Sequence, residues 1–336
     1  AYKLDLSKSG LNFPGIKNFP KNTEVETFIT VTGQAKGAYI RSVVPTPKIV
    51  TVKQRHSFVE LPDDDYTPRE FDSRAGYMSI SFMDFASPID EQIVKKFIAR
   101  HRLIKKQPHL EISEPVEPII YYLDRGTPEP VRSALIEGGN WWNEAFEYAG
   151  FKNAFRVEVA PEGMDLLDVR YNAIQWVHRS TRGWSYGASV KDPRTGEIIK
   201  GHVSLGSLRV RQDYLIAQGL LQPFKTGESG DKRMLQMALA RLRQLSAHEI
   251  GHTLGLSHNF SSSASERSSV MDYPHPLITS DNNNLNFDIA YDTKIGAWDK
   301  RAIKYGYGYP LSNSDEKNFL RTTLEYTFED GYEFIS

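Results

Sequence analysis

The segment from residue 248 to residue 258, HEIGHTLGLSH, constrains the fold of this 336-residue chain more than any other. His248 and His252 are four residues apart, so on a helix their imidazoles project from one face and can bind one metal ion. Glu249 lies further round the helix, within reach of a metal-bound water. Gly255 permits a backbone turn that other residues resist, which returns His258 as a third ligand. Three neutral ligands and one open position predict a catalytic zinc site.

The alternative interpretation is a helix that carries surface histidines and ends at a glycine cap. It explains each residue separately, but the long motif has five fixed positions, which rarely occur together by chance. We therefore expect this chain to bind one catalytic Zn²⁺ ion.

A second motif, SVMDYP, occupies residues 269–274. Together the two motifs resemble those of the metzincin zinc endopeptidases, whose long zinc motif is followed by a methionine-containing turn, the Met-turn. The resemblance implies that Met271 is buried beneath the metal. It also implies that Tyr273 ligates zinc in the resting site or stabilises the oxyanion. The alternative for Met271 is an ordinary methionine of the core. The alternative for Tyr273 is an ordinary half-buried tyrosine.

The composition excludes several other classes of protein. The net charge is −1, and no long basic run suggests binding to nucleic acid or to an anionic membrane. No apolar segment approaches the roughly 18 residues of a membrane-spanning helix. The chain has no cysteine, so a metal must be held by His, Asp, Glu or Tyr, and latency cannot depend on a thiol. No signal peptide is visible at Ala1.

Local patterns predict an α+β fold with three regions. Residues 1–104 are expected to form a β-rich N-terminal region, because β-branched residues alternate there with polar ones. Residues 105–117 carry prolines and charges without periodicity, which predicts a linker. Residues 118–336 are expected to form the catalytic domain. Within the first region we predict strands at 25–32, 48–61 and 77–82, and a helix at 90–102.

The catalytic region shows the order strand, helix, several strands and a long helix. Thr127 is expected to cap a helix that runs to Ala149, with Pro128 at its first position. The zinc motif ends a second helix predicted from residue 231 to about residue 254. The remaining predicted elements are strands at 118–123, 155–159, 169–177, 184–190 and 197–205, and an amphipathic segment at 298–305.

This order is similar to the metzincin layout, a twisted mixed sheet of about five strands with an active-site helix and a Met-turn. By analogy, residues 184–191 form the edge strand that pairs with an extended substrate. His275 follows the Met-turn and is a further candidate for the substrate pocket. The candidate substrate-binding residues are therefore Tyr186, Gly187, Ala188, Ser189 and His275.

Three other segments carry a closer resemblance. Residues 71–77 (FDSRAGY), 192–198 (DPRTGEI) and 295–303 (IGAWDKRAI) are similar to an uncharacterised bacterial family of zinc-dependent metalloproteases. Members are common among Bacteroidetes, usually exported, and typically longer than this chain. The resemblance implies an extracytoplasmic location, in the periplasm, at the surface or secreted.

The favoured function is a zinc-dependent endopeptidase in which Glu249 is the general base for a zinc-activated water. One alternative is an amidase or exopeptidase with the same metal site. Another is a latent or inactive scaffold that recognises peptides or glycans, although such a scaffold has no need of Glu249. The N-terminal third could be a structural buttress, a binding domain or a cover over the cleft.

Some polar residues have weaker assignments. Asn259 and Asp272 are candidates for orienting a histidine ligand, although each is as readily a turn residue. Residues 281–288 carry oxygen ligands that could hold calcium, but they lack the spacing of an EF-hand, so a solvated loop is favoured.

Overall fold

A computed structural model describes residues 2–179, 183–221, 232–281, 284–310 and 315–336. The chain forms two compact units. The first contains Ala1–Pro62 and Asp165–Arg170, and the second contains Asp63–Met164 and Tyr171–Ser336. The first unit is shorter than the N-terminal region expected at 1–104. Residues 105–117 belong to the second unit, where Ser113 pairs with Phe151.

The first unit is built around one long strand with buried acids. Strand β4 pairs antiparallel with β5 along its full length, from Asn22↔Val59 to Thr32↔Ile49. Glu26 is buried and binds Arg55 at 2.8 Å and Lys53 at 3.2 Å, so its charge is compensated. The elements are β1 (Lys3–Leu4), β2 (Gly10–Leu11), β3 (Lys17–Asn18), β4 (Asn22–Thr32), α1 (Ala38–Val43) and β5 (Ile49–Val59), with short 3-10 turns at Leu6–Lys8 and Phe13–Gly15.

A five-stranded mixed sheet organises the second unit, in the order β11-β12-β10-β8-β9. Four strands run parallel to one another: β8, β9, β10 and β12. The fifth, β11, lies at the edge and pairs antiparallel with β12. The mixed sheet and the edge position of β11 are therefore confirmed. The strands are β8 (Ile119–Leu123), β9 (Phe155–Val159), β10 (Asn172–Val177), β11 (Tyr186–Lys191) and β12 (Ile198–Gly206).

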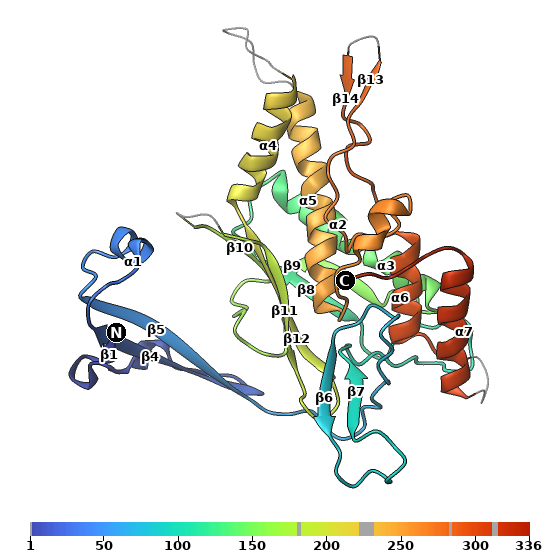
Figure 1. Cartoon of the computed structure of the whole chain (residues 1–336), viewed down its shortest axis with the longest axis horizontal. Helices are drawn as coiled ribbons and strands as arrows, with labels where there is room; N and C mark the ends of the chain where they lie inside the picture. The colour runs from blue at the N-terminus through green and yellow to red at the C-terminus, as the bar shows by residue number, and fades with distance from the viewer. Residues whose placement is uncertain (1, 180–182, 222–231, 282–283, 311–314) are drawn as a thin grey trace. The chain divides into compact units, whose positions relative to one another are not determined.

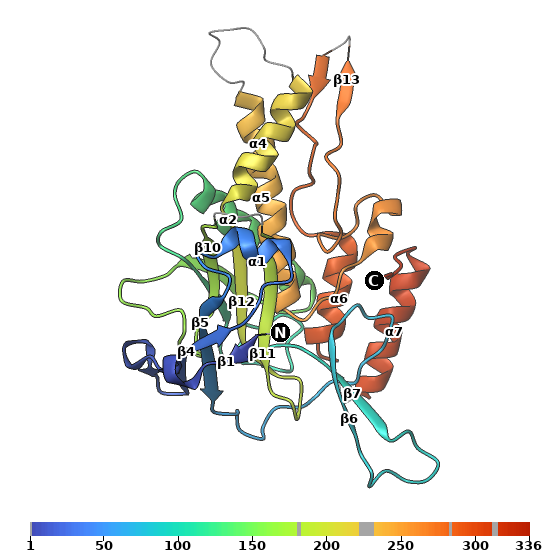
Figure 2. The same ribbon diagram turned by 60° about the vertical axis from the view of Figure 1, so that its left-hand side comes forward.

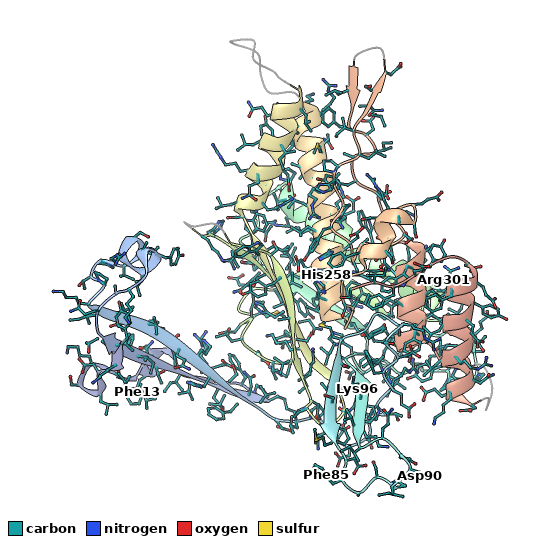
Figure 3. All side chains as sticks on the ribbon, in the orientation of Figure 1. Phe13, Phe85, Asp90, Lys96, His258 and Arg301 are labelled. Atoms are coloured by element: carbon teal, nitrogen blue, oxygen red, sulfur yellow. The ribbon has the colours of Figure 1, made fainter. Side chains whose placement is uncertain are left out.

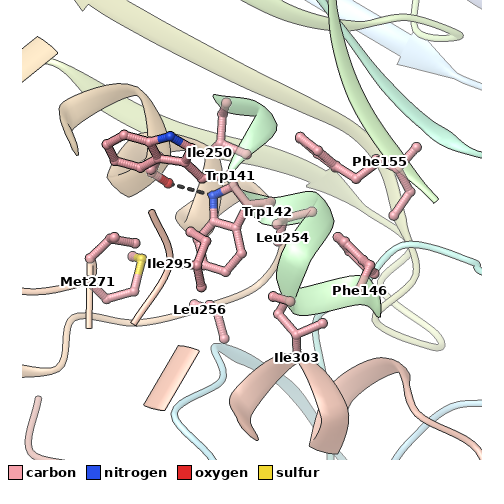
Figure 4. Close-up of a cluster of buried hydrophobic side chains, with 14 of the residues drawn as sticks. Trp141, Trp142, Phe146, Phe155, Ile250, Leu254, Leu256, Met271, Ile295 and Ile303 are labelled. Carbon is pink, nitrogen blue, oxygen red and sulfur yellow. Dashed lines mark hydrogen bonds between the residues drawn. The ribbon is translucent and has the colours of Figure 1, made fainter. Parts of the chain in front are cut away.

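The zinc-motif helix α5 (Lys232–Thr253) packs closely against α2 (Val131–Asn140) in the core of this unit (Figure 1). A Cβ on Gly138 would lie 2.1 Å from the carbonyl oxygen of Arg243, so only glycine allows this approach. The indole of Trp142, which opens α3 (Trp142–Tyr148), donates to the carbonyl of Ala247 at 2.8 Å (Figure 4). Buried Phe146, Phe155 and Ile250 join the same hydrophobic cluster.

Two helix predictions were wrong in detail. The helix expected from Thr127 to Ala149 is two helices that meet at Trp141, and its N-cap is Pro130 rather than Thr127. The helix expected at 90–102 is instead strand β7 (Val94–Ile98), which pairs with β6 (Ser79–Met83). A short apolar run fits a helix and a strand equally well, and the pairing with β6 satisfies the backbone of β7.

Among the described residues, three helices were not predicted: the short α1 of the first unit, α4 and α7. Helix α4 (Leu208–Leu221) buries Ala217 near α5 but leaves Leu215 and Ile216 exposed, so its apolar residues mark no single face. Helix α7 (Glu316–Glu329) packs beside α6 (Ala297–Tyr307), the segment expected at 298–305 (Figure 2). The remaining elements are a 3-10 turn (Phe260–Ala264) and the strands β13 (Thr279–Asp281) and β14 (Asn284–Asn286).

Side chains from distant segments satisfy the last carbonyls of α5. His101 Nε2 lies 3.1 Å from the carbonyl oxygen of Thr253, and the Tyr307 hydroxyl donates to that of Leu254 at 2.9 Å. These carbonyls have no partner within the helix, and leaving them unpaired in the core would be costly. Burial lowers the pKa of His101 to about 4, so this imidazole is neutral at pH 7.

This burial predicts that the second unit becomes less stable in mild acid. The unfolded chain binds a proton at His101 below pH ~6.5, whereas the folded chain resists protonation until about pH 4. The stability is therefore undiminished above pH ~6.5 and falls between that pH and 4, and the loss at pH 5 is roughly 2 kcal/mol. His101→Gln should weaken the decline in urea stability from pH 7 to pH 5 by that amount.

Tryptophan fluorescence suits this measurement because all five tryptophans, at positions 141, 142, 176, 184 and 298, lie in the second unit. Parallel pH profiles for the wild type and the variant would contradict the assignment to His101.

Candidate active site

The three motif histidines come together at the C-terminal end of α5. One ligand atom from each of His248, His252 and His258 lies within 4.8 Å of the other two. The Nε2 atoms of His252 and His258 are 3.2 Å apart. His258 lies beside the end of α5 after the chain has turned back (Figure 3). The arrangement is that of three nitrogen ligands around one small ion.

Backbone carbonyls orient two of these rings. His248 Nδ1 lies 2.8 Å from the carbonyl oxygen of Val270, and His252 Nδ1 lies 2.8 Å from that of Leu256. A carbonyl only accepts hydrogen bonds, so each Nδ1 carries the proton and each Nε2 keeps a free lone pair. Both expected orienting residues have other partners: Asn259 binds Glu333 and Ile335, and Asp272 binds Ser262 and Ser263.

The electrostatics of the trio fit a metal ion. Burial lowers the pKa of His248 well below its usual value and lowers that of His252 to about 4. Burial also lowers the pKa of the more exposed His258. A histidine can bind a metal ion only when its imidazole is neutral. The three rings therefore present unprotonated nitrogens at neutral pH.

The turn that returns His258 depends on Gly255, as the sequence predicted. Gly255 has φ +105°, and a Cβ there would lie 1.9 Å from the carbonyl oxygen of Ala99. The backbone of residues 76–78 braces the same turn: Met78 donates to Gly255 at 2.7 Å, and Ser257 donates to Gly76 at 2.8 Å. This part of the N-terminal third therefore supports the path between the second and third ligands.

Met271 is fully buried beneath α5, as the resemblance implied. A Cβ on Gly251 would lie 2.3 Å from the Met271 sulfur and 2.7 Å from the Trp142 ring. Gly251 lies between the two helical histidines, so its missing side chain lets the Met-turn pass directly under the site. The carbonyl of Met271 also accepts from the backbone of Asn259, which follows His258.

Asp299 holds the Met-turn and was not anticipated from the sequence. Its side chain is fully buried at the start of α6. It accepts hydrogen bonds from the backbone of Val270 at 2.8 Å, the backbone of Gly296 at 3.0 Å and the Ser269 hydroxyl at 2.6 Å. Burial raises the pKa of Asp299 to about 7, although these three donors lower it.

Removing the Asp299 carboxyl is expected to destabilise the site. Asp299→Ala leaves three donors without an acceptor in the core, at about 1–3 kcal/mol each, so we expect a total loss of at least about 3 kcal/mol. Because Val270 also orients His248, zinc affinity should fall with stability. Thermal melts and zinc titrations would measure both effects. Asp299→Asn is the matched control, because its amide oxygen can still accept from the two backbone groups; equal losses in both variants would contradict this role.

Glu249 is buried beside the trio with a strongly perturbed carboxyl group. Burial raises the pKa of Glu249 to about 7, while Arg241 and a backbone hydrogen bond from Gly187 lower it. Gly187 belongs to the edge strand β11, and a Cβ there would lie 2.1 Å from the carbonyl oxygen of Glu249. The edge strand therefore runs directly alongside the zinc-motif helix.

Tyr273 is half-exposed and packs against the ligand rings. Its ring centroid lies 4.5 Å from that of His258 and 5.2 Å from that of His248. Burial and the Glu249 carboxylate raise the pKa of Tyr273, so its hydroxyl is a donor at neutral pH. The tyrosine lies at the site, and its catalytic role stays a prediction.

A cavity of about 360 Å³ opens beside Glu249 and Tyr273. Residues that sequence reasoning missed line it, among them Arg179, Arg209 and Arg241, and Trp184 from the expected substrate segment at 184–191 lines it too. A possible signal was Arg241 itself, because it lies two helical turns before Glu249 on the same face of α5. The candidates at 186–189 lie on the adjacent edge strand rather than in the lining, and His275 is exposed outside it. Their substrate-binding roles stay predictions.

No second metal site accompanies the first one in the described part of the chain, where His248, His252 and His258 form the only such cluster. The suggested calcium loop at 281–288 begins at the last residue of β13 and contains all of β14, and residues 282–283 lie outside the described residues. Across the described ranges, no helix has the length and apolar character needed to cross a membrane.

Two parts of the chain match known family models. Residues 230–336 match a family described as Met-zincin (DUF4953), and residues 1–106 match a domain of unknown function (DUF5117). No curated protein matches the chain. The Met-zincin match covers the zinc motif and the Met-turn, so the resemblance to metzincins is confirmed for this region. A Met-zincin region with an intact histidine trio suggests a zinc metallopeptidase.

Proposed function

We propose that this protein is a zinc-dependent endopeptidase in which Glu249 is the general base. The observation that carries the proposal is the placement of a buried carboxyl group next to three converging, neutral imidazoles. His248, His252 and His258 would hold the ion. When bound, zinc supplies Lewis-acid chemistry, which polarises a carbonyl group and acidifies water.

The protein's own groups then manage proton and substrate. The Glu249 carboxylate accepts the proton of the attacking water and passes it to the leaving amine nitrogen, and burial, which raises the pKa of Glu249, makes it a better proton acceptor than an exposed carboxylate. Tyr273 donates a hydrogen bond to the developing oxyanion. The outer edge of β11, which pairs with no second strand among the described residues, presents Tyr186 to Ser189 to the backbone of an extended substrate, beside the Gly187 amide that donates to Glu249.

Metal analysis combined with cleavage of a mixed peptide library tests this proposal. We expect one zinc per chain, internal cleavage sites, loss of cleavage on chelation and recovery on addition of zinc. Release of terminal residues alone would instead support an exopeptidase. Bound zinc without any cleavage would support a recognition scaffold, and absence of zinc would overturn the proposal.

A further inference from the structure

The cavity beside Glu249 has an unusual charge. Its lining includes three arginines, Arg179, Arg209 and Arg241, and Glu249 is its only acidic residue in the described part of the chain. The arginines come from three separate segments: the end of β10, the start of α4 and the middle of α5. The convergence therefore results from the fold and not from one basic run in the sequence.

Arg241 is the innermost of the three. Its side chain is buried, and it lies one and two turns from Leu245 and Glu249 along the same face of α5. It contacts Gln244 and lies 5.7 Å from the centre of the Tyr291 ring. No ion pair with Arg241 occurs among the described residues, although a buried cation is costly without an anionic partner.

Neighbouring charges only partly compensate this cluster. Arg209 binds Asp213 at 2.8 Å, so one of the three positive charges has a carboxylate partner. Arg179 donates to the carbonyl of Trp184 at 3.1 Å and forms no ion pair with any residue that the structure describes. Burial and repulsion from Arg209 lower the pKa of Arg241, and the nearby Asp213 and Glu249 carboxyl groups offset this only in part, so an anion entering the cavity would add favourable charge interactions.

The walls of the cavity select what kind of anion can enter. Leu245, Trp184 and Tyr273 provide apolar surface around the guanidinium groups. A cavity of about 360 Å³ has room for one amino-acid side chain. It opens next to the carboxyl group of the general base, so its occupant is a residue next to the reacting bond.

We propose that this cavity binds the side-chain carboxylate of a substrate glutamate or aspartate next to the scissile bond, which makes the enzyme selective for acidic peptides. The position of the bound residue next to a scissile bond rests on the proposed function. The preference for a carboxylate can be measured as binding, without turnover. Charge-assisted hydrogen bonds from guanidinium groups to a carboxylate supply the selectivity. Each arginine is a specificity residue in this assignment.

The test compares capped decapeptides of alanine that carry Glu, Gln or Lys at one central position. Binding to the zinc-loaded Glu249→Gln variant, measured by calorimetry, reports the preference without hydrolysis. We expect the Glu peptide to bind about 10- to 100-fold more tightly than the Gln peptide, since hydrogen bonds to charged groups contribute about 1.5–3 kcal/mol. The Lys peptide should bind most weakly. The wild type should show the same order in kcat/KM.

Arginine variants show which cavity residues are responsible. Arg179→Gln changes a half-exposed residue, so it tests the proposal even if Arg241→Gln fails to fold. In both variants the Glu/Gln ratio should fall towards one, whereas Arg321→Gln on the exposed face of α7 should preserve it. An uncapped Gln peptide distinguishes the other source of a carboxylate: if its free C-terminus binds better than the capped Glu side chain, the proposal is overturned.

The outcomes separate the two proposals. Equal binding and equal cleavage of the Glu and Gln peptides would overturn the acidic preference and leave the peptidase intact. Preferential binding of the Glu peptide without cleavage of any peptide by the wild type would overturn the peptidase and retain the carboxylate-binding cavity.

Discussion

Replacing Glu249 with glutamine is expected to lower kcat/KM by roughly 10²- to 10⁴-fold, the usual contribution of a positioned general base. Glutamine has the size of glutamate, but its amide cannot accept the proton of the attacking water. The histidine nitrogens remain in place because backbone carbonyls, and not Glu249, orient His248 and His252. Zinc content should therefore stay at one ion per chain.

Cleavage kinetics with a peptide from the library and metal analysis of the same preparation would measure both quantities. Glu144→Gln is the matched control, because Glu144 lies on α3 and pairs only with Lys294 and Lys300 among the described residues. That variant should keep wild-type activity. A Glu249→Gln protein with near-normal hydrolysis would remove Glu249 from the mechanism, and a loss of zinc would mean that the residue has a structural role.

Replacing Gly255 with alanine is expected to lower stability and zinc affinity together. Alanine at φ +105° costs about 1–2 kcal/mol in backbone strain. Its Cβ would also lie 1.9 Å from the Ala99 carbonyl oxygen, a rigid backbone atom, and overpacking of this kind costs about 1–3 kcal/mol more. The turn must shift to relieve the contact, which displaces His258. Zinc affinity should therefore fall together with the melting temperature.

Gly163→Ala is the matched control for the strain. Gly163 also lies in the second unit and has φ +78°, but nothing lies within 4 Å of the position of its Cβ. This variant should lose only about 1–2 kcal/mol and keep its zinc affinity. Melts of the metal-free proteins and zinc titrations would show the difference. Equal losses in the two variants would mean that Ala99 does not constrain the turn.

The zinc-binding residues could be predicted because their relation is local. A separation of four residues places His248 and His252 about one turn apart on the same face of a helix. A glycine after the helix then permits the turn to His258. The same holds for strands with clear alternation, such as β4 and β5. Where the pattern was short, as at Val94–Ile98, the sequence could not decide between helix and strand, and pairing with β6 decided it.

The residues around the trio could not be predicted, because each arrives from a distant segment. Asp299 lies 29 residues after Val270, yet it holds that residue in the Met-turn. His101 reaches Thr253 across a separation of 152 residues. Nothing in the local sequence distinguishes such residues from surface acids or histidines, because their roles arise from burial and partners that only the folded core provides.

The sequence by itself determined the chemistry: three imidazoles for one metal ion, a carboxylate beside them and a methionine turn to follow. Helix periodicity and the conformational freedom of glycine are properties of a few consecutive residues, so they are visible before folding. Only the tertiary structure decided how the site is braced and what its cavity attracts. Arg179, Arg209 and Arg241 become one positive surface because the end of the central strand β10, α4 and α5 meet beside Glu249.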